Sequence, residues 1–220
     1  MSEIRHTRGP YKSGLMRRKQ ILAKASEVFA TYGYGAGSLR QIAVEVGVTP
    51  AALMRHFESK EDLLVEVLRY WGEQSPKPDG DAAGVEYFEG LRSVMRYNAN
   101  HRGFLELFLT LSTEASNPGH PAGNFIRERN AQTLERFTWH LASAVQRGEV
   151  IRMDSIEISA ECRTLISVMD GLELQWLLDP SVELVSLFDR HLDLTIVRWT
   201  ASGDKGPCSP LAKEVASAPE

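Results

Sequence analysis

The 220-residue chain has few of the residues that mark disulfide-bonded, metal-binding or membrane proteins. Its two cysteines, Cys162 and Cys208, provide neither a disulfide framework nor the spacing of a metal site. No apolar run approaches the roughly 18 residues of a membrane span, and the N-terminus carries no apolar signal region. The sequence therefore predicts a cytoplasmic protein that does not contact a membrane.

Motifs of catalysis and cofactor binding are also missing from the sequence. It has no Gly-rich phosphate loop, no Gly-x-Ser-x-Gly nucleophile motif and no His-Glu-x-x-His zinc motif. Its six histidines form no close pair with cysteine or carboxylate partners. We therefore expect no metal, no cofactor and no enzymatic activity. An enzyme with an active site in the C-terminal part remains a remote alternative.

Charge is distributed unevenly along the chain. Residues 1–60 contain ten Lys and Arg residues and four Asp and Glu residues, which gives them a net charge of +6. The whole chain carries −4, so residues 61–220 carry −10. Phosphate attracts the basic head and repels the acidic remainder, which would orient the protein on a DNA duplex. A basic N-terminus can also be an ordinary solvated tail, unless a DNA-binding motif coincides with it.

A short stretch within this basic head has the pattern of two helices joined by a tight turn. Ser38 and Gln41 form a capping box that starts the first helix, and Gly47 stands where a left-handed backbone would end it. Thr49 is a suitable N-cap and Pro50 suits the first helical position, so a second helix begins almost at once. Such a pair is a helix-turn-helix, whose second helix can enter the major groove.

Amphipathic helices flank this unit on both sides. The preceding helix is expected over about residues 17–32, and a following helix is expected to begin after the N-cap Ser59. Three helices can then bury a shared core. We assign residues 15–58 to a helix-turn-helix DNA-binding domain, preceded by a flexible basic arm over residues 1–14 and followed by a connecting helix over residues 59–71.

The order of these motifs resembles that of the TetR family of bacterial transcriptional regulators. The resemblance is specific over residues 15–71, where FATYGY (29–34) precedes the unit and HFESKE (56–61) follows it. Farther on, DGLELQWLLDP (170–180) is similar to the C-terminal helices of some actinobacterial members. The resemblance implies that a small effector bound between the C-terminal helices moves the connecting helix and changes the separation of two recognition helices.

We expect DNA contacts from the exposed side of the helix-turn-helix and from the ends of its helices. The candidates combine cationic side chains, small groups on the recognition helix and N–H groups at helix N-termini. They are Ser38, Arg40, Thr49, Pro50, Ala51, Arg55, His56 and Lys60. Arg40 can equally be a solvated surface charge, and His56 can equally have a packing role. The N-terminal arm could reach the minor groove, although such segments are more often mobile tails.

The rest of the chain is expected to be all-α. Pro, Gly and acidic residues interrupt every periodicity over residues 72–83, which we assign to a linker. Apolar residues then recur at helical spacing, without strand alternation, through residues 84–200. We assign residues 84–200 to an effector-binding and dimerisation domain. Residues 201–220, rich in Ser, Gly, Pro and Ala, are expected to form a disordered tail.

The last two predicted helices are the expected dimer interface. The first follows the acidic capping pair Asp154 and Glu157, and the second is expected to begin at Asp179-Pro180. Their apolar stripes could close a four-helix interface with a second copy of the chain. The expected interface residues are Leu165, Leu172, Trp176, Val185, Phe188, Leu192 and Ile196. Alternatively, these stripes pack into the core of their own chain.

An effector pocket is expected among the helices that precede this interface. Aromatic and apolar side chains could line a cavity for an apolar or aromatic small molecule, with a few polar groups to orient it. The expected lining residues are Phe88, Met95, Phe104, Phe108, Phe125, Asn130, Trp139, Met169 and Glu173. Aromatic residues at helical spacing are more often plain core, and this alternative stays open.

These features predict a two-domain, all-α, homodimeric DNA-binding regulator. Two-fold symmetry would match a palindromic double-stranded operator with half-sites one helical turn apart. The predicted function is that of a repressor released from its operator by a small hydrophobic or aromatic effector. The alternative is a DNA-binding regulator that answers to a protein partner and has no small-molecule effector.

Overall fold

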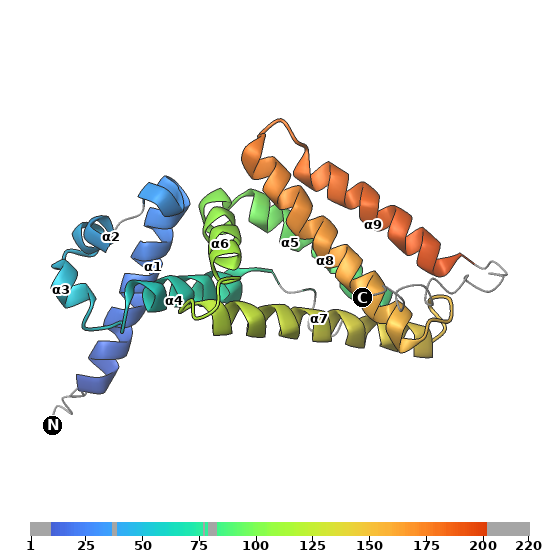
Figure 1. The fold of residues 1–220 in the computed structure, drawn as a ribbon, viewed down its shortest axis with the longest axis horizontal. Coiled ribbons are helices and arrows are strands. Elements are labelled where there is room, and N and C mark those ends of the chain that lie inside the picture. The colour runs from blue at the N-terminus through green and yellow to red at the C-terminus, as the bar shows by residue number, and fades with distance from the viewer. Residues whose placement is uncertain (1–9, 37–38, 77, 79–82, 202–220) are drawn as a thin grey trace, which may run out of the picture.

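The computed structural model describes residues 10–36, 39–76, 78 and 83–201, and in these ranges the chain forms α-helices and no strands. The all-α fold class is therefore confirmed. The helices are α1 (Pro10–Ala36), α2 (Leu39–Val46), α3 (Pro50–Leu53), α4 (Lys60–Gln74), α5 (Val85–Ala99), α6 (Arg102–Glu114), α7 (Gly123–Gln146), α8 (Ser155–Leu178) and α9 (Leu184–Thr200). They form an elongated molecule with α1, α2 and α3 at one end and α9 at the other (Figure 1). None of the helices in these ranges combines the length and hydrophobicity that a bilayer crossing requires.

Local sequence signals set several of the helix starts. Thr49 Oγ1 accepts a hydrogen bond from the N–H of Ala52 at 3.1 Å, which caps α3. Ser59 Oγ accepts one from the N–H of Asp62 at 3.0 Å, which caps α4. The predicted acidic pair at the start of α8 forms a complete capping box. These side-chain acceptors satisfy backbone donors that have no partner within the helix, so the predicted N-caps Thr49, Ser59 and Asp154 are confirmed. The predicted N-cap Ser38 lies outside the described residues.

Two of the predicted segment boundaries need correction. The helix α1 begins at Pro10, so residues 10–14 are helical and do not belong to a flexible arm. The helix α4 continues to Gln74, which is within the segment 72–83 assigned above to the linker. Residues 1–9 and 202–220, which include most of the predicted arm and tail, lie outside the described residues.

The start of the last helix also differs from the prediction. The helix α9 begins at Leu184 and not at Asp179-Pro180. The Asp179 carboxylate accepts a hydrogen bond from the N–H of Ser181 at 2.9 Å, and the N–H of Val182 donates to the Asp179 carbonyl at 3.1 Å. These bonds close a separate turn between α8 and α9, which an Asp side chain is well suited to form.

Two clusters of buried apolar residues hold the helices together. The first core joins α1, α2, α3 and α4 and continues into α6, where Phe104 and Leu105 belong to it. The second core lies among α5, α7, α8 and α9, around the fully buried Phe88 and Trp199. Trp176 on α8 packs against both cores. The two ends of the molecule are therefore joined by packed helices as well as by the chain between α4 and α5.

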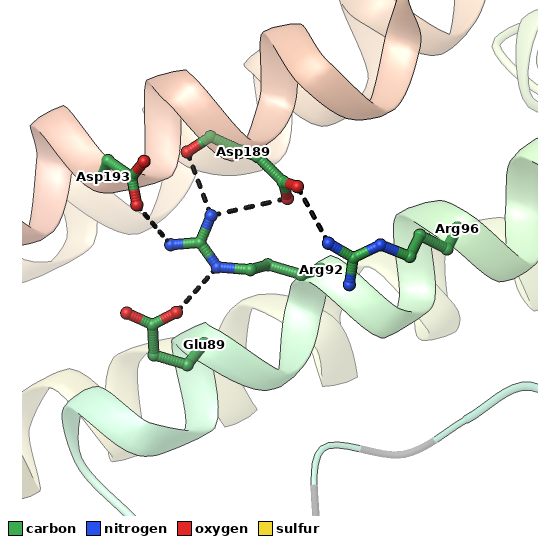
Figure 2. Close-up of polar contacts among 5 residues, drawn as sticks. All are labelled: Glu89, Arg92, Arg96, Asp189 and Asp193. Atoms are coloured by element: carbon green, nitrogen blue, oxygen red, sulfur yellow. Dashed lines mark hydrogen bonds and ion pairs between the residues drawn. The ribbon is translucent and has the colours of Figure 1, made fainter.

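An ion-pair network fastens α5 to α9 beside the second core (Figure 2). Arg92 lies at its centre: Nε is 2.7 Å from Glu89 Oε2, and Nη2 is 2.6 Å from Asp193 Oδ1. Asp189 on α9 pairs with both arginines of α5: its Oδ1 lies 3.4 Å from Arg92 Nη1, and its Oδ2 accepts a hydrogen bond from Arg96 Nη2 at 2.9 Å. The hydrogen bond to Glu89 is the main cause of the raised pKa of Arg92. The network thus fixes the position of α9 along α5.

Candidate DNA-binding surface and effector pocket

The helices α2 and α3 meet in the tight turn that the sequence predicts. Gly47 has a φ of +71°, in the left-handed region that favours glycine. The N–H of Val48 donates to the carbonyl of Ala43 at 2.8 Å, and the N–H of Gly47 donates to the carbonyl of Val44 at 3.0 Å. Ala43 and Leu53 are fully buried. The small Ala43 and the apolar Leu53 thus form part of the core of this helix-turn-helix.

The outer side of α2 and α3 carries most of the residues expected to contact DNA. Five of them have exposed side chains, as contact with DNA requires: Arg40, Thr49, Pro50, Ala51 and Arg55. His56 is half-buried next to the buried Phe57. Ser38 and the side chain of Lys60 lie outside the described residues. Contact with DNA remains a prediction for all eight.

Two adjacent arginines of α1 hydrogen-bond to backbone carbonyls at the ends of α2 and α3. Arg17 Nη2 donates to the carbonyl of Val46 at 3.2 Å, at the end of α2. Arg18 donates to the carbonyl of His56, just after α3, and its guanidinium lies 4.5 Å from the centre of the Phe57 ring. Cationic donors are favourable at helix C-termini, where carbonyl groups lack partners. These arginines, counted above only as part of the basic head, hold the two helices in place.

The sequence does contain a signal for this supporting role. Arg17 and Arg18 precede the buried Ile21 and Leu22 by one helical turn, so they lie on the face of α1 that the first core covers. Cations on that face are placed to reach backbone carbonyls of neighbouring helices. Counting charge alone misses this positional information.

A cavity of about 350 Å³ lies between the end of α4 and the helices α5, α6, α7 and α8. Small-molecule sites in proteins typically enclose roughly 300–1,000 Å³. Apolar and aromatic side chains make up most of its wall, and several polar groups interrupt it. The wall includes Trp71, Gly72, Tyr87, Asn98, Phe108, Arg129, Asn130, Arg136, Met169, Asp170 and Glu173. The cavity is thus the size of a small-molecule pocket and has the mixed lining of one.

Some of the residues expected to line an effector pocket lie in the wall of this cavity, and their contact with an effector stays a prediction. Phe108, Asn130, Met169 and Glu173 are in the wall of this cavity. The other five expected residues are not, and this part of the prediction needs correction: Phe88, Met95, Phe104, Phe125 and Trp139. Helical periodicity indicates which faces of the helices are apolar but not which neighbouring helix each face meets.

Each of the five residues has another place in the fold. Phe88 and Met95 are fully buried in the second core. Phe104 belongs to the first core, where its ring stacks on Trp71 with centroids 5.6 Å apart. The other two also have different surroundings: Phe125 lies under the guanidinium of Arg69, and Trp139 is 61% exposed. The core alternative is therefore correct for Phe88, Met95 and Phe104.

Glu173 is a buried carboxyl group in the cavity wall. Its side chain is 3% exposed, and its Oε1 accepts a hydrogen bond from Asn98 Nδ2 at 2.7 Å. Burial is the main cause that raises the pKa of Glu173 from 4.5 to about 7, and Asp170 raises it further, whereas Asn98 and Arg129 oppose the rise. At neutral pH, Glu173 therefore exists in both its neutral and its charged form.

Two arginines of α7 lie in the same wall. Burial is the main cause that lowers the pKa of Arg129, and the nearby charge of Arg136 lowers it further. The Arg129 guanidinium lies 4.8 Å from the centre of the Phe108 ring. Among the described residues no carboxylate oxygen lies within ion-pair distance of Arg129 or Arg136. Their positive charges therefore remain available to the cavity.

Sequence reasoning missed Trp71, Asn98 and Arg129 as cavity residues. Asn98 follows Leu91 and Met95 on the buried stripe of α5, and a polar residue within an apolar stripe is a usable signal. Trp71 is an apolar residue at the end of the predicted connecting helix, but its Nε1 is buried without a hydrogen-bond partner among the described residues. No local pattern would have placed the end of α4 against α7.

The predicted dimer residues need a correction as well. Leu165, Phe188 and Leu192 are at most 1% exposed and lie in the second core of their own chain. They have no surface left for a partner, so the alternative of packing within the chain is correct for these three. Leu172, Trp176, Val185 and Ile196 are half-buried. The buried apolar residues of α8 and α9 thus pack against α5 and α7 within the chain.

The opposite sides of α8 and α9 carry a different set of apolar residues. These side chains are large and exposed, between 42% and 78%: Ile156, Leu174, Leu178, Leu187, Leu194 and Val197. Single exposed apolar residues are common on protein surfaces, but six on one helical hairpin are typical of an interaction surface. We call them the outer apolar residues of α8 and α9.

Comparison with known proteins agrees with this architecture. Residues 21–67 match a family model described as bacterial regulatory proteins, tetR family. The HTH-type transcriptional repressor KstR2 of Mycolicibacterium smegmatis is 42% identical over 198 residues, which cover 88% of this chain and 82% of that protein. A regulator from Cytophaga hutchinsonii has a similar fold, with a TM-score of 0.71 at 16% identity, over 87% of this chain and 98% of that one. FadR from Bacillus subtilis, in complex with stearoyl-CoA, has a TM-score of 0.62 at 22% identity, over 82% and 98% of the two chains.

Proposed function

The chain belongs to the TetR family of bacterial regulatory proteins, and from that premise we propose that it is a homodimeric repressor released from its operator by a small, mainly apolar effector. The observation that carries this proposal is the position of the cavity. Its wall includes Trp71 and Gly72, in the last turns of α4, and α4 begins directly after the recognition unit. One helix therefore extends from the effector site to the DNA-binding surface.

The DNA-binding half of the proposal rests on the exposed outer side of α2 and α3. Thr49 and Arg55 are exposed there, and the unit belongs to the end of the chain with the +6 net charge. Arg55 can bond to a guanine edge or a phosphate, and Thr49 can reach either. One unit reads one half-site, and two units of a symmetric dimer would read half-sites about 34 Å apart.

The dimer in this proposal uses the outer apolar residues of α8 and α9. Regulators of this family act as dimers. Leu194 and Val197 are 61% and 62% exposed and lie on the same outer side of α9, while Leu174 and Leu178 are exposed on α8. Burying such side chains against a second copy removes apolar surface from water, at roughly 25 cal/mol per Å². The network around Arg92 holds α9 in the position that this interface would require.

Release of the operator by an effector is proposed from two sets of contacts that hold α4, one at the cavity and one with α1. At the cavity, the Trp71 ring stacks on Phe104 and Tyr97, with centroids 5.6 Å and 6.4 Å apart. Near the middle of α4, Glu66 pairs with Arg18, which also donates to the carbonyl of His56. An effector that repacks the aromatic stack would shift α4, and that shift would move the recognition unit. Release follows if the effector binds the shifted form more tightly.

The relatives support an effector but do not identify it. KstR2 of Mycolicibacterium smegmatis is a transcriptional repressor, and FadR of Bacillus subtilis holds stearoyl-CoA. A regulator without an effector would have no use for a cavity with buried polar groups, since such groups cost stability when unpaired. The cavity therefore favours a small molecule over a protein partner as the signal.

The proposal is tested in two steps with the full-length protein. Genomic sites bound in the source organism are mapped first, and the shared sequence is used as a labelled duplex. Tight binding to this duplex and release by one member of an apolar metabolite library are the expected results. Failure to prefer any genomic site over random DNA contradicts the regulator. Tight binding that no compound weakens contradicts only the effector.

A further inference from the structure

We infer that the effector is a compact apolar acid, a molecule with one carboxylate that Arg129 and Arg136 bind while its apolar body lies against the cavity wall. This inference rests on the proposed function, because it specifies what the same cavity takes up. It draws on the charges in the wall, on an unpartnered donor, and on the volume of the cavity.

The two arginines are the first part of the argument. Arg129 and Arg136 are two helical turns apart on α7, and both line the cavity. They are close enough that the charge of Arg136 lowers the pKa of Arg129. Neither has a carboxylate oxygen within ion-pair distance among the described residues, and Arg129 rests on the Phe108 ring instead. A ligand carboxylate between them would supply the missing partner, because guanidinium groups form strong, directional bonds to carboxylates.

The charge balance of the wall favours a single negative charge on the ligand. Asp170 and Glu173 also lie in the wall and attract Arg129 from a distance. Glu173 is largely buried and bonded to Asn98, and at neutral pH it is charged in only part of the molecules. The two arginines thus outweigh Asp170 and a partly neutral Glu173. One added anion brings the cavity near neutrality, whereas a cation would add to its excess of positive charge.

Trp71 supplies an independent sign that a polar ligand group belongs here. It is 4% exposed, lines the cavity, and its Nε1 has no hydrogen-bond partner among the described residues. A buried donor without a partner costs roughly 1–3 kcal/mol, so native proteins seldom retain one without a use. An oxygen acceptor on the ligand would satisfy it. Trp71 belongs to α4, so this contact would link the ligand directly to the helix that carries the signal.

The volume of the cavity limits the body of this acid. About 350 Å³ is at the lower end of small-molecule sites, so a compact ring or a short branched chain fits better than an extended molecule. Leu91, Val94 and Ile166 provide aliphatic wall, and Tyr87 and Phe108 provide aromatic wall. These groups would bury the body and leave the charged end beside α7.

Three probes with the same body test the inference. They are 4-cyclohexylbutanoic acid, its primary amide and 4-cyclohexylbutylamine, each titrated calorimetrically into the full-length protein at pH 7. The acid should bind at least about tenfold more tightly than the amide, because its bonds to the arginines are charge-assisted. The amine should bind most weakly. Equal affinities for the acid and the amide would overturn the inference, as would no binding of the acid at 1 mM.

Variants locate the binding of the charge. Arg129→Met and Arg136→Met should each weaken binding of the acid about tenfold and leave the affinity for the amide unchanged. Unchanged binding of the amide would show that the cavity is intact. Arg127→Met is the matched control, because Arg127 is an exposed arginine of the same helix outside the cavity wall. Asp170→Asn should raise the affinity for the acid, since it removes a competing negative charge. Acid affinity that none of these variants changes would overturn the inference.

The outcomes also separate this inference from the proposed function. If the amide binds as tightly as the acid and releases the operator duplex, the effector cavity stands and only its preference for an acid is wrong. If the acid binds through both arginines but does not weaken operator binding, the acid site stands and the proposed release mechanism is wrong.

Discussion

Arg18 on α1 and Glu66 on α4 form an ion pair with an N–O distance of 3.2 Å. The same guanidinium donates to the carbonyl of His56 and lies over the Phe57 ring, at the end of the recognition unit. One side chain therefore joins the first helix, the recognition unit and the connecting helix, whose far end borders the cavity through Trp71. A displacement of α4 would change all of these contacts together. Arg18 is thus placed to position the recognition unit without touching DNA.

Arg18→Met should weaken operator binding about tenfold while leaving the number of phosphate contacts unchanged. Methionine retains an apolar stem over Phe57 but loses the hydrogen bond and a partly exposed ion pair, so the free energy of unfolding should fall by only about 1 kcal/mol. Operator titrations at several salt concentrations check this, and the slope of log affinity against log salt should match the wild type. A slope reduced by about one would mean that Arg18 contacts a phosphate. Lys19→Met, an equal change of charge at an exposed neighbour, should have a smaller effect.

Arg55→Ala should weaken operator binding by roughly 1–3 kcal/mol and leave the fold intact. Arg55 is exposed just after α3, so the substitution removes a cation from the proposed interface and no core contact. Operator affinity at fixed salt and the far-ultraviolet circular dichroism spectrum are the two measurements. Arg127→Ala, at an exposed position on α7, is the control and should leave the affinity unchanged. An Arg55→Ala protein with wild-type affinity would remove Arg55 from the interface.

The helix-turn-helix could be predicted because its signals are local. Gly47 adopts the left-handed backbone that its position requires, and Thr49 caps the next helix within three residues. Such features depend on a few neighbouring residues, so the sequence contains all the information. Arg55 could be placed on the exposed side for the same reason, since Leu53 fixes which side of the short helix is buried.

The cavity and the dimer surface could not be placed in the same way. Periodicity indicates that Phe88 and Phe188 lie on buried faces, but it does not indicate which helix covers them. In the structure both are fully buried in the second core, and neither lines the cavity. Polar residues on apolar stripes would have been the better guide, because Asn98, which the prediction missed, is hydrogen-bonded to Glu173 in the cavity wall.

Glu173→Gln should remove part of the pH dependence of stability. Burial raises the pKa of Glu173 from 4.5 to about 7, so between these pH values the unfolded chain loses the proton that the folded chain retains. The stability contributed by this group is therefore fully present below pH 4.5, falls as the pH rises to 7, and stays low above it. Glutamine can keep the bond from Asn98. The variant should gain roughly 1–3 kcal/mol over the wild type between pH 5 and pH 8.

Urea unfolding at pH 5, 6, 7 and 8, at one fixed protein concentration, measures this difference. Glu135→Gln, at an exposed position on α7, is the control and should follow the wild type at every pH. A constant offset between Glu173→Gln and the wild type across these pH values would show that Glu173 titrates alike in the folded and unfolded chains.

Arg92→Met should destabilise the junction of α5 and α9 (Figure 2). The Arg92 side chain is only 18% exposed, and its loss would leave three carboxylates of the network facing Arg96 alone. We expect the free energy of unfolding to fall by about 2 kcal/mol at low salt, with a smaller loss at 1 M salt because ions screen the repulsion. Asp193→Asn is the contrast: this side chain is 65% exposed, so its loss should cost much less. Equal losses for the two variants would contradict a central role for Arg92.

Leu194→Glu combined with Val197→Glu should dissociate the dimer without unfolding the chain. Both side chains are more than 60% exposed on α9, so charges there stay in water in the monomer but would be buried against a partner. Operator affinity should fall with the dimer, because a single recognition unit lacks the effective concentration of the linked pair. Analytical ultracentrifugation at micromolar concentration and circular dichroism measure the two effects.

Two further variants show whether the position of these charges matters. Phe188→Glu should unfold the chain, because Phe188 is fully buried in the second core and a charge there has no route to water. Trp139→Glu should leave the dimer intact, because Trp139 is equally exposed but belongs to α7. If Trp139→Glu dissociates the dimer and the α9 double variant does not, the interface lies along α7, and α8 and α9 have another purpose for their exposed apolar residues.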